Sequence, residues 1–333
     1  MEKLDTSRRV AIPMTHLPIF RTQIAIEAGV ERKVMFKTWG GIGDQICAEP
    51  TLRYATRMFK DCDIYLASEL PDLFQHLEFK KVFNLKEETP NYSKYLCLET
   101  ITPPDESNLV WQFFSHMLTN CVDFPSLCSL RLQLPVADKE IQLWPESSVD
   151  VIEMSKYNNK NSVLIHAGKH WPSKTFPKEF WDRVLAGLLV RGVQPILIGA
   201  DTDDNRGTVD VNTDGCVDLR NKLSIMESVW LCKNAKVLLT NDSSPMHMAA
   251  SGDAWIGYVA TCKHPDLITH WRHGQWQWRE KNFGVGGIWD VIDYCPNKEQ
   301  EVTADKVPLD LLKSWLPNPI DMAQWASEKV NGI

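Results

Sequence analysis

Several features that would point to a class of protein are missing from this chain of 333 residues. It contains no run of eighteen or more apolar residues, so we expect no membrane-spanning helix. The residues from Met1 to Asp5 do not begin a signal-peptide apolar core. Its nine cysteines are scattered and include no Cys-x-x-Cys pair, which argues against a disulfide framework and a structural zinc site. We therefore expect a soluble cytoplasmic protein with reduced cysteines.

The chain also lacks an excess of basic residues. Its formal net charge of −7 provides no general attraction for nucleic acid or anionic lipid, so a polyanionic partner would need a local basic patch. Hydrophobic residues make up 44% and charged residues 24% of the chain, which are values of a globular protein. A chain of this length is expected to form two domains.

Short apolar segments alternate with amphipathic segments in two series, which predicts an α/β fold with a parallel, doubly wound sheet in each half. Strands are expected at 34–38, 63–67, 81–83, 95–98, 162–166, 194–198, 236–240 and 254–259. Helices are expected at 46–59, 70–77, 108–120, 177–191, 224–232, 305–316 and 320–330.

The domain boundary is expected in the extended, proline-punctuated segment 130–145. This position predicts an N-terminal domain over residues 1–150, which begins with an extended arm at 1–32. A C-terminal domain should cover 151–300, and terminal helices should cover 301–333.

The stretch with the clearest functional pattern runs from Leu238 to Ala250 and has the order strand, polar hinge, helix. Asp242, Ser243 and Ser244 are residue types that cap helices, and Pro245 suits a first helical turn. A helix that begins at a strand end directs free backbone N–H groups at an anion, as in the phosphate sites of α/β sheets. An ordinary capped turn would have the same pattern.

Two further stretches support a site at the same sheet edge. Gly40, Gly41 and Gly43 lie between a strand and a helix, where glycine allows a tight turn and close approach to a ligand, and Asp44 follows as either a cap or a base. The loop from His166 to Pro177 carries Lys169, His170 and Lys174, which could neutralise a diphosphate leaving group or form a solvated basic loop.

Four motifs in this order resemble the heptosyltransferases of glycosyltransferase family 9. They are Gly-Ile-Gly-Asp44 followed by Pro50, Lys174-x-Phe-Pro-x-Glu-x-Trp, the 219–231 segment with Leu-Ser-Ile-Met-Glu, and Asn-Asp-Ser-Ser-Pro-Met-His247. The resemblance covers about residues 33–260 and implies the GT-B fold, in which two Rossmann-like doubly wound domains face a central cleft. It implies that the N-terminal domain binds the acceptor and the C-terminal domain binds a nucleotide sugar.

The resemblance also implies a role for individual residues. Asp44 matches the proposed general base, next to the acceptor loop with Gly41 and Gly43. Lys174 matches the lysine on the phosphate side of the donor, with Lys169 nearby. The segment that holds the donor sugar and diphosphate corresponds to Asp242, Ser243, Ser244 and His247, where Ser244 stands in place of the family's glycine. Asp203, or the adjacent Asp204, falls near the acidic position that contacts ribose.

The implied reaction is an inverting transfer that needs neither a metal nor a cofactor, because the nucleoside diphosphate sugar is itself a substrate. Asp44 takes a proton from the acceptor hydroxyl while the hydroxyl oxygen attacks the anomeric carbon, and the diphosphate leaves toward Lys174. The segment Asp201-Thr-Asp203 matches an Asp-x-Asp metal pattern of a different glycosyltransferase fold, and we expect no metal there.

The segment 263–281 departs from the family and interleaves basic residues with tryptophans. Trp271, Arg272, Trp276 and Arg279 could contact a sugar or a nucleic acid, or could simply pack the terminal helices. Because the tryptophan spacing fits neither a helix face nor a strand face, a loop is expected. Three functions stay open: transfer to lipopolysaccharide core or another glycan, with peripheral membrane contact, transfer to hydroxymethylated bases in duplex DNA, and nucleotide-sugar binding without catalysis. The sequence leaves the donor and the oligomeric state undetermined.

Overall fold

The computed structural model describes residues 33–99, 122–132, 134–136, 138–158, 161–201, 207–261, 263–285 and 307–333. The arm expected at 1–32 and the helix expected at 108–120 lie outside these described residues. In the part of the chain that is described, no helix is long and apolar enough to cross a membrane.

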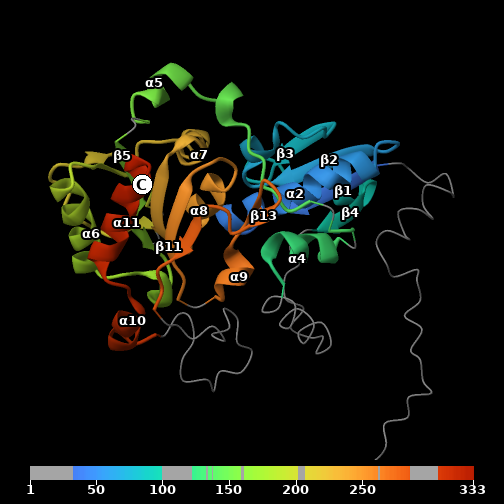
Figure 1. Ribbon diagram of the computed structural model, residues 1–333. Coiled ribbons are helices and arrows are strands. Elements are labelled where there is room, and N and C mark those ends of the chain that lie inside the picture. Colours follow the sequence, from blue (N-terminus) through green and yellow to red (C-terminus); the bar gives the residue numbers. More distant parts are fainter. Residues whose placement is uncertain are drawn as a thin grey trace, which may run out of the picture.

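The first half of the chain forms a four-stranded parallel sheet in the order β3-β2-β1-β4, which appears at the right of Figure 1. Its elements are β1 (Lys33–Thr38), α2 (Ile42–Met58), β2 (Asp63–Ser68), β3 (Lys81–Asn84) and β4 (Leu96–Glu99). The helix predicted at 70–77 is wrong, because only a 3₁₀ turn forms at Pro71–Phe74. One turn suffices to bury Leu73 and Phe74 before the chain continues toward β3.

The second half forms a six-stranded parallel sheet in the order β14-β11-β10-β5-β7-β9. Its strands are β5 (Ser162–His166), β7 (Gln194–Leu197), β9 (Val217–Asp218), β10 (Val237–Asn241), β11 (Trp255–Val259) and β14 (Glu280–Asn282). Numbered along the chain from β5, this order is 3-2-1-4-5-6, the doubly wound topology, whose switch point lies between β5 and β10. Both strands at the switch point are buried along their whole length, as expected for a sheet that is covered on both faces.

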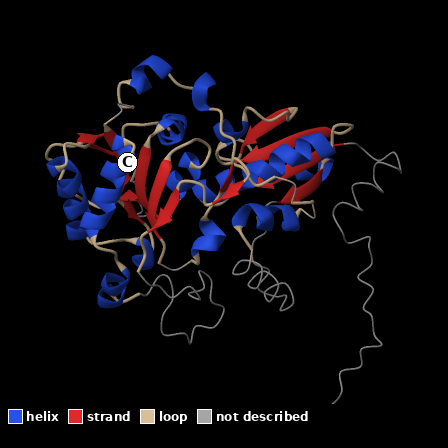
Figure 2. Cartoon of the chain, viewed as in Figure 1, coloured by secondary structure: helices blue, strands red, loops and turns tan. Residues whose placement is uncertain are grey.

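The helices of the second half lie on both sides of this sheet (Figure 2). They are α6 (Lys178–Val190), α7 (Ile225–Asn234), α8 (Ser244–Ala249), α9 (Pro265–Ile268), α10 (Leu309–Trp315) and α11 (Pro319–Asn331). The predicted terminal helices are thus present as α10 and α11. Helix α11 packs against α6, where a Cβ added at Gly187 would lie 2.8 Å from Cβ of Ala323.

The connection between the two halves is partly helical and is attached to α2. Helix α4 (Phe124–Arg131), which the sequence pattern did not predict, packs on α2 and overlaps the start of the segment expected to be extended. The next part of the connection is held by Arg53, which donates to Asp138 Oδ2 at 2.6 Å and to the carbonyl of Glu140 at 2.5 Å. Glu49 accepts from the Gln142 N–H at 2.9 Å. These contacts attach the connection to the first sheet's main helix. Beyond them, the short helix α5 (Val151–Ser155) leads into the second half.

Helices α2 and α8 pack directly against each other, so the two halves of the chain meet at the carboxyl ends of their central strands. A Cβ added at Gly43 would lie 2.9 Å from Cδ2 of His247 and 3.7 Å from Cα of Ser244. The glycine therefore allows the two halves to approach at the edge where parallel sheets bind ligands.

Candidate active site

A cleft of about 590 Å³ lies between the two halves of the chain. Residues from the β1–α2 turn, the loop after β5 and the β10–α8 turn line it. Among them are nine residues that the sequence singled out: Gly41, Gly43, Asp44, Lys169, Lys174, Asp242, Ser243, Ser244 and His247. The structure therefore brings together residues that are separated by up to about 200 positions in the chain. Asp203 lies outside the described residues.

The β1–α2 turn presents Asp44 at the cleft. Gly40 has φ +97°, a left-handed conformation that favours glycine. The carboxylate of Asp44 accepts a hydrogen bond from the Gly41 N–H at 2.8 Å, so it caps the start of α2. The two roles proposed for Asp44, cap and cleft residue, are thus compatible, because a carboxylate can accept several hydrogen bonds.

In the β10–α8 turn, a carboxylate forms an ion pair with a lysine from the loop that follows β5. Nζ of Lys174 lies 2.7 Å from Oδ2 of Asp242, and both side chains are largely buried. Burial alone would raise the pKa of Asp242, but Lys174, by its charge and its hydrogen bond, lowers this pKa below the usual range with help from Lys263. Helix α8 has only six residues, so Lys174 rather than a helix dipole supplies most of the positive charge here.

Asn241, a residue that sequence reasoning missed, holds the lysine loop in place. Its side-chain amide donates to the carbonyl of Gly168 at 3.1 Å and to the carbonyl of Lys174 at 2.6 Å. A Cβ added at Gly168 would lie 2.5 Å from Oδ1 of Asn241, so the loop passes very close to this side chain. The position of Asn241, at the end of β10 directly before Asp242, is the only signal in the sequence that could have pointed to it.

Two histidines at the site are neutral, the buried His166 and the half-buried His247. His166, at the end of β5, has Nδ1 3.0 Å from Oγ of Ser243 and 3.3 Å from Oγ1 of Thr240. Burial lowers the pKa of His166 to about 4. Burial is the main cause that lowers the pKa of His247 to about 3. Neither imidazole therefore adds a cation to the cleft at neutral pH.

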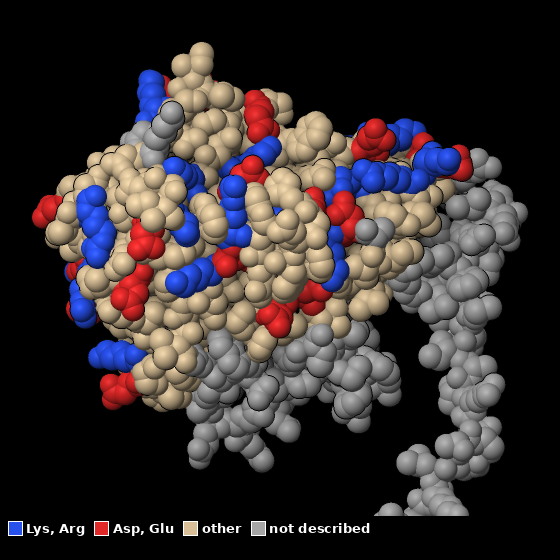
Figure 3. Space-filling view, viewed as in Figure 1, with Lys and Arg blue, Asp and Glu red and all other residues tan. Residues whose placement is uncertain are grey.

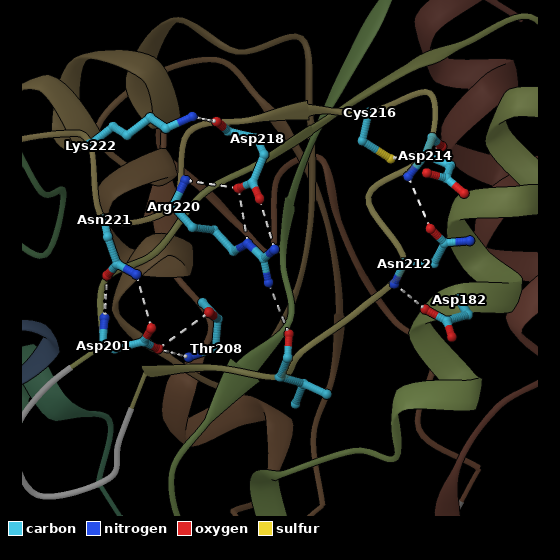
Figure 4. A network of polar contacts seen from close by, with 11 residues as sticks. Asp182, Asp201, Thr208, Asn212, Asp214, Cys216, Asp218, Arg220, Asn221 and Lys222 are labelled. Carbon is cyan, nitrogen blue, oxygen red and sulfur yellow. Dashed lines mark hydrogen bonds and ion pairs between the residues drawn. The ribbon is translucent and has the colours of Figure 1, made fainter.

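Asp201 is part of a polar network at the far edge of the second sheet (Figure 4). Asp201 Oδ2 accepts from Nδ2 of Asn221 at 2.9 Å, and its Oδ1 accepts from the N–H of Thr208 at 3.0 Å. These bonds lower the pKa of Asp201. Nearby, Arg220 donates to both carboxylate oxygens of Asp218. In the described part of the chain, no group of three or more histidine, cysteine or acidic side chains is placed to hold a metal ion.

The tryptophan-rich segment is a hairpin and not the loop predicted from its spacing. Strand β12 (Trp271–Arg272) pairs in antiparallel fashion with β13 (Gln275–Trp276), and the turn between them has φ 51° at His273 and φ 68° at Gly274. The rings of Trp271 and Trp276 lie 5.7 Å apart. A two-residue turn reverses the chain, which explains why the tryptophans follow neither regular period.

The arginines of this segment are used for packing. Arg272 is 3% exposed and donates to the carbonyls of Gly252, Ala254 and Trp278. Arg279 stacks 4.1 Å above the ring of Trp278 and donates to the carbonyl of Asp253 at 2.8 Å. The suggested polyanion contact by Arg272 is therefore wrong for this fold, since the guanidinium is buried. Acidic and basic side chains are also intermixed on the face shown in Figure 3.

The comparisons with known proteins agree with this geometry. A sequence profile described as glycosyltransferase family 9 (heptosyltransferase) matches residues 74–255, which is more than half of the chain. No match was found among the curated proteins.

Several solved structures share the fold at low sequence identity. A glycosyltransferase family 9 protein from Veillonella parvula has a TM-score of 0.57 and 13% identity, over 90% of this chain and 98% of that one. The iron-containing dodecameric glycosyltransferase TibC from enterotoxigenic Escherichia coli also has a TM-score of 0.57, with 16% identity over 89% of this chain and 77% of that one.

Heptosyltransferase II of Escherichia coli has a TM-score of 0.51 and 14% identity, over 87% of this chain and 99% of that one. These likenesses, with two parallel sheets meeting at one cleft, confirm the expected GT-B fold. The profile match shows more than the fold: the chain belongs to glycosyltransferase family 9, the heptosyltransferase family.

Proposed function

We propose that this protein transfers a heptose from a nucleoside diphosphate heptose to a hydroxyl group of a glycan, with inversion at the anomeric carbon. The observation that carries the proposal is the placement of Asp44 from one half of the chain and the Lys174–Asp242 pair from the other around one cleft. A fold neighbour, TibC, was solved in complex with ADP-D-beta-D-heptose, which supports a donor of this kind.

In this scheme Asp44 is the general base. It accepts the proton of the acceptor hydroxyl as the hydroxyl oxygen forms the new bond to the anomeric carbon. Because a carboxylate is a weak base in water, the proton moves during the attack and not before it. The bond between Asp44 and the Gly41 N–H fixes the carboxylate at the start of α2, which favours one direction of attack.

The nucleoside diphosphate leaves with the electron pair of the broken bond, and Lys174 stabilises the developing charge. Asp242 keeps the ammonium of Lys174 in place, at a distance of 2.7 Å. Lys169 and Lys263 line the same cleft and add positive charge around the diphosphate. The scheme uses no metal ion, so we expect turnover to persist in the presence of a chelator.

We propose a glycan as the acceptor, and the peripheral membrane contact proposed with it would bring the enzyme to a lipid-linked glycan. The burial of Arg272 leaves the DNA acceptor without its main support, because the tryptophan-rich hairpin does not offer an exposed basic surface at this position.

The test is the release of ADP from ADP-heptose in the presence of deacylated lipopolysaccharide core, with hydroxymethylpyrimidine duplex DNA as the alternative acceptor. We expect release that depends on the glycan and continues in EDTA. Release that depends only on DNA would overturn the glycan acceptor. Donor binding without release on any acceptor would indicate a catalytically silent binding protein.

A further inference from the structure

A chain of polar side chains, the buried Glu280 and His270 followed by the half-buried His247, runs from the hairpin region to the cleft. Nδ1 of His270 lies 2.9 Å from Oε1 of Glu280, and Nε2 of His270 lies 2.8 Å from Nδ1 of His247. The side chains of His270 and Glu280 are 2% and 1% exposed. His270 comes from the segment that departs from the family pattern, and Glu280 is the first residue of β14.

The direction of these hydrogen bonds follows from the groups around Glu280. The guanidinium of Arg272, which can only donate, also lies 3.9 Å from Oε1 of Glu280. An ionised carboxylate can only accept, so His270 must carry its proton on Nδ1. With the single N–H of a neutral imidazole on Nδ1, Nε2 of His270 is an acceptor for the Nδ1–H of His247, and the proposal below includes this protonation state of His270.

This order leaves His247 with an unprotonated Nε2. The Cδ2–Nε2 edge of the ring faces Gly43, where an added Cβ would lie 3.3 Å from Nε2, and His247 lines the cleft. Burial and the charge of Lys174 lower the pKa of His247, while Asp242 raises it, and the pKa reaches about 3. The ring therefore stays neutral.

Cys47 does not disturb the arrangement. Its Sγ lies 3.4 Å from Nδ1 of His247, a geometry that could suggest a cysteine–histidine nucleophile. Burial and neighbouring acidic groups raise the pKa of the Cys47 thiol well above its usual value, so the sulfur stays protonated and inert. The Cys47 sulfur is also a weak acceptor, so it competes poorly with His270 for the Nδ1–H of His247.

We propose that Glu280 and His270 are positioning residues that fix the tautomer of His247, so that its Nε2 accepts a hydrogen bond from a hydroxyl group of the donor sugar. A phosphate oxygen offers no proton, so this nitrogen distinguishes the sugar from the diphosphate. The proposal rests on the proposed function for the identity of the donor, but the tautomer itself does not depend on it.

The first test is nitrogen-15 NMR of the ligand-free protein with labelled histidine, with the His247 signals assigned by comparison with His247→Gln. We expect a protonated Nδ1 and an unprotonated Nε2 for His247, the reverse of the tautomer that prevails for histidine in water. In His270→Phe, the Cys47 S–H becomes the partner of Nδ1, and we expect the proton of His247 to move to Nε2. A proton on Nε2 of the unmodified protein would overturn the proposal.

The second test compares the affinities for ADP and for ADP-heptose. We expect His270→Phe and Glu280→Leu to weaken binding of ADP-heptose by about tenfold, as for the loss of one hydrogen bond, and to leave ADP binding within about twofold. Equal losses for both compounds would mean that His247 contacts the diphosphate, which overturns the proposal. Asp253→Asn is the matched control, because it changes an exposed histidine–carboxylate pair with His273.

If the protein binds neither compound, the proposed donor is wrong, and the tautomer measured in the ligand-free protein still decides the positioning role. Thermal unfolding of each variant shows whether it is folded. Should His270→Phe not fold, Glu280→Leu removes the acceptor for the His270 Nδ1–H at a similar side-chain volume and allows the same two measurements.

Discussion

The two strand-to-helix turns that meet at the cleft are built differently. In the β1–α2 turn, Asp44 bonds the N–H of Gly41, three residues earlier. In the β10–α8 turn, Asn241 bonds a carbonyl 67 residues away and Ser243 bonds a histidine 77 residues away. The first turn is therefore organised by its own sequence, and the second by the loop that follows β5.

This difference has consequences for how each turn responds to mutation. A change at Asp44 affects one side chain whose backbone is held locally, so it should alter chemistry and leave stability nearly unchanged. A change in the β10–α8 turn removes partners from the lysine loop, so stability and donor binding should change together. The predictions below, from the largest effect to the smallest, test this contrast.

Asp44→Asn should lower kcat by about 10²–10⁴-fold, the range for loss of a general base. The asparagine oxygen can still accept from the Gly41 N–H, so the unfolding midpoint and donor affinity should change little. Turnover with ADP-heptose and glycan, with donor binding by calorimetry, measures both. Asp321→Asn, at the same kind of position in the first turn of α11, is the matched control. Unchanged turnover in Asp44→Asn would remove the base from the scheme.

Lys174→Met should lower the free energy of unfolding by about 3 kcal/mol, because it leaves the buried carboxylate of Asp242 without its cation. The double variant Lys174→Met/Asp242→Asn should recover most of this loss and still bind the diphosphate weakly. Urea unfolding of the single and double variants measures the coupling. If the double variant is no more stable than Lys174→Met, the pair does not contribute as proposed.

Stability should fall as the pH is lowered from about 6.5 to about 4. The pKa of His166 is lowered to about 4, so the unfolded chain takes up a proton in this range before the folded protein does. The contribution of His166 is present above pH 6.5 and amounts to on the order of 3 kcal/mol. Unfolding at several pH values should show a shallower dependence in His166→Gln, whereas His273→Gln on the exposed hairpin turn should retain the original slope.

Asn241→Ala should lower the free energy of unfolding by about 2 kcal/mol, from the loss of two hydrogen bonds in a mostly buried position. Because these bonds hold the carbonyl of Lys174, the KM for the donor should rise more than kcat falls. Steady-state kinetics with varied ADP-heptose separates the two effects. A variant that loses stability but keeps the original KM would show that Asn241 does not position the lysine.

Most of the elements that build the site could be predicted from the sequence. The buried strands β1, β5 and β10 have apolar runs, and the residues after them are the glycine, serine and aspartate types that end strands and begin helices. The expectation of one site at a shared sheet edge also included both Lys174 and Asp242. In contrast, the one-turn helix at Pro71–Phe74 and helix α4 were mispredicted or missed, because their lengths depend on how the chain packs on α2 and the first sheet.

By itself, the sequence determined the alternation of strands and helices, the two polar turns and the family motifs, because periodicity and capping are local properties. Only the tertiary structure decided that Arg272 is buried, that Asn241 holds the lysine loop, and that His270 connects Glu280 to His247. Each of these contacts joins segments that are distant in the chain or folded back by a hairpin. Such pairings depend on how the sheets and helices pack, and no local pattern of residues encodes them.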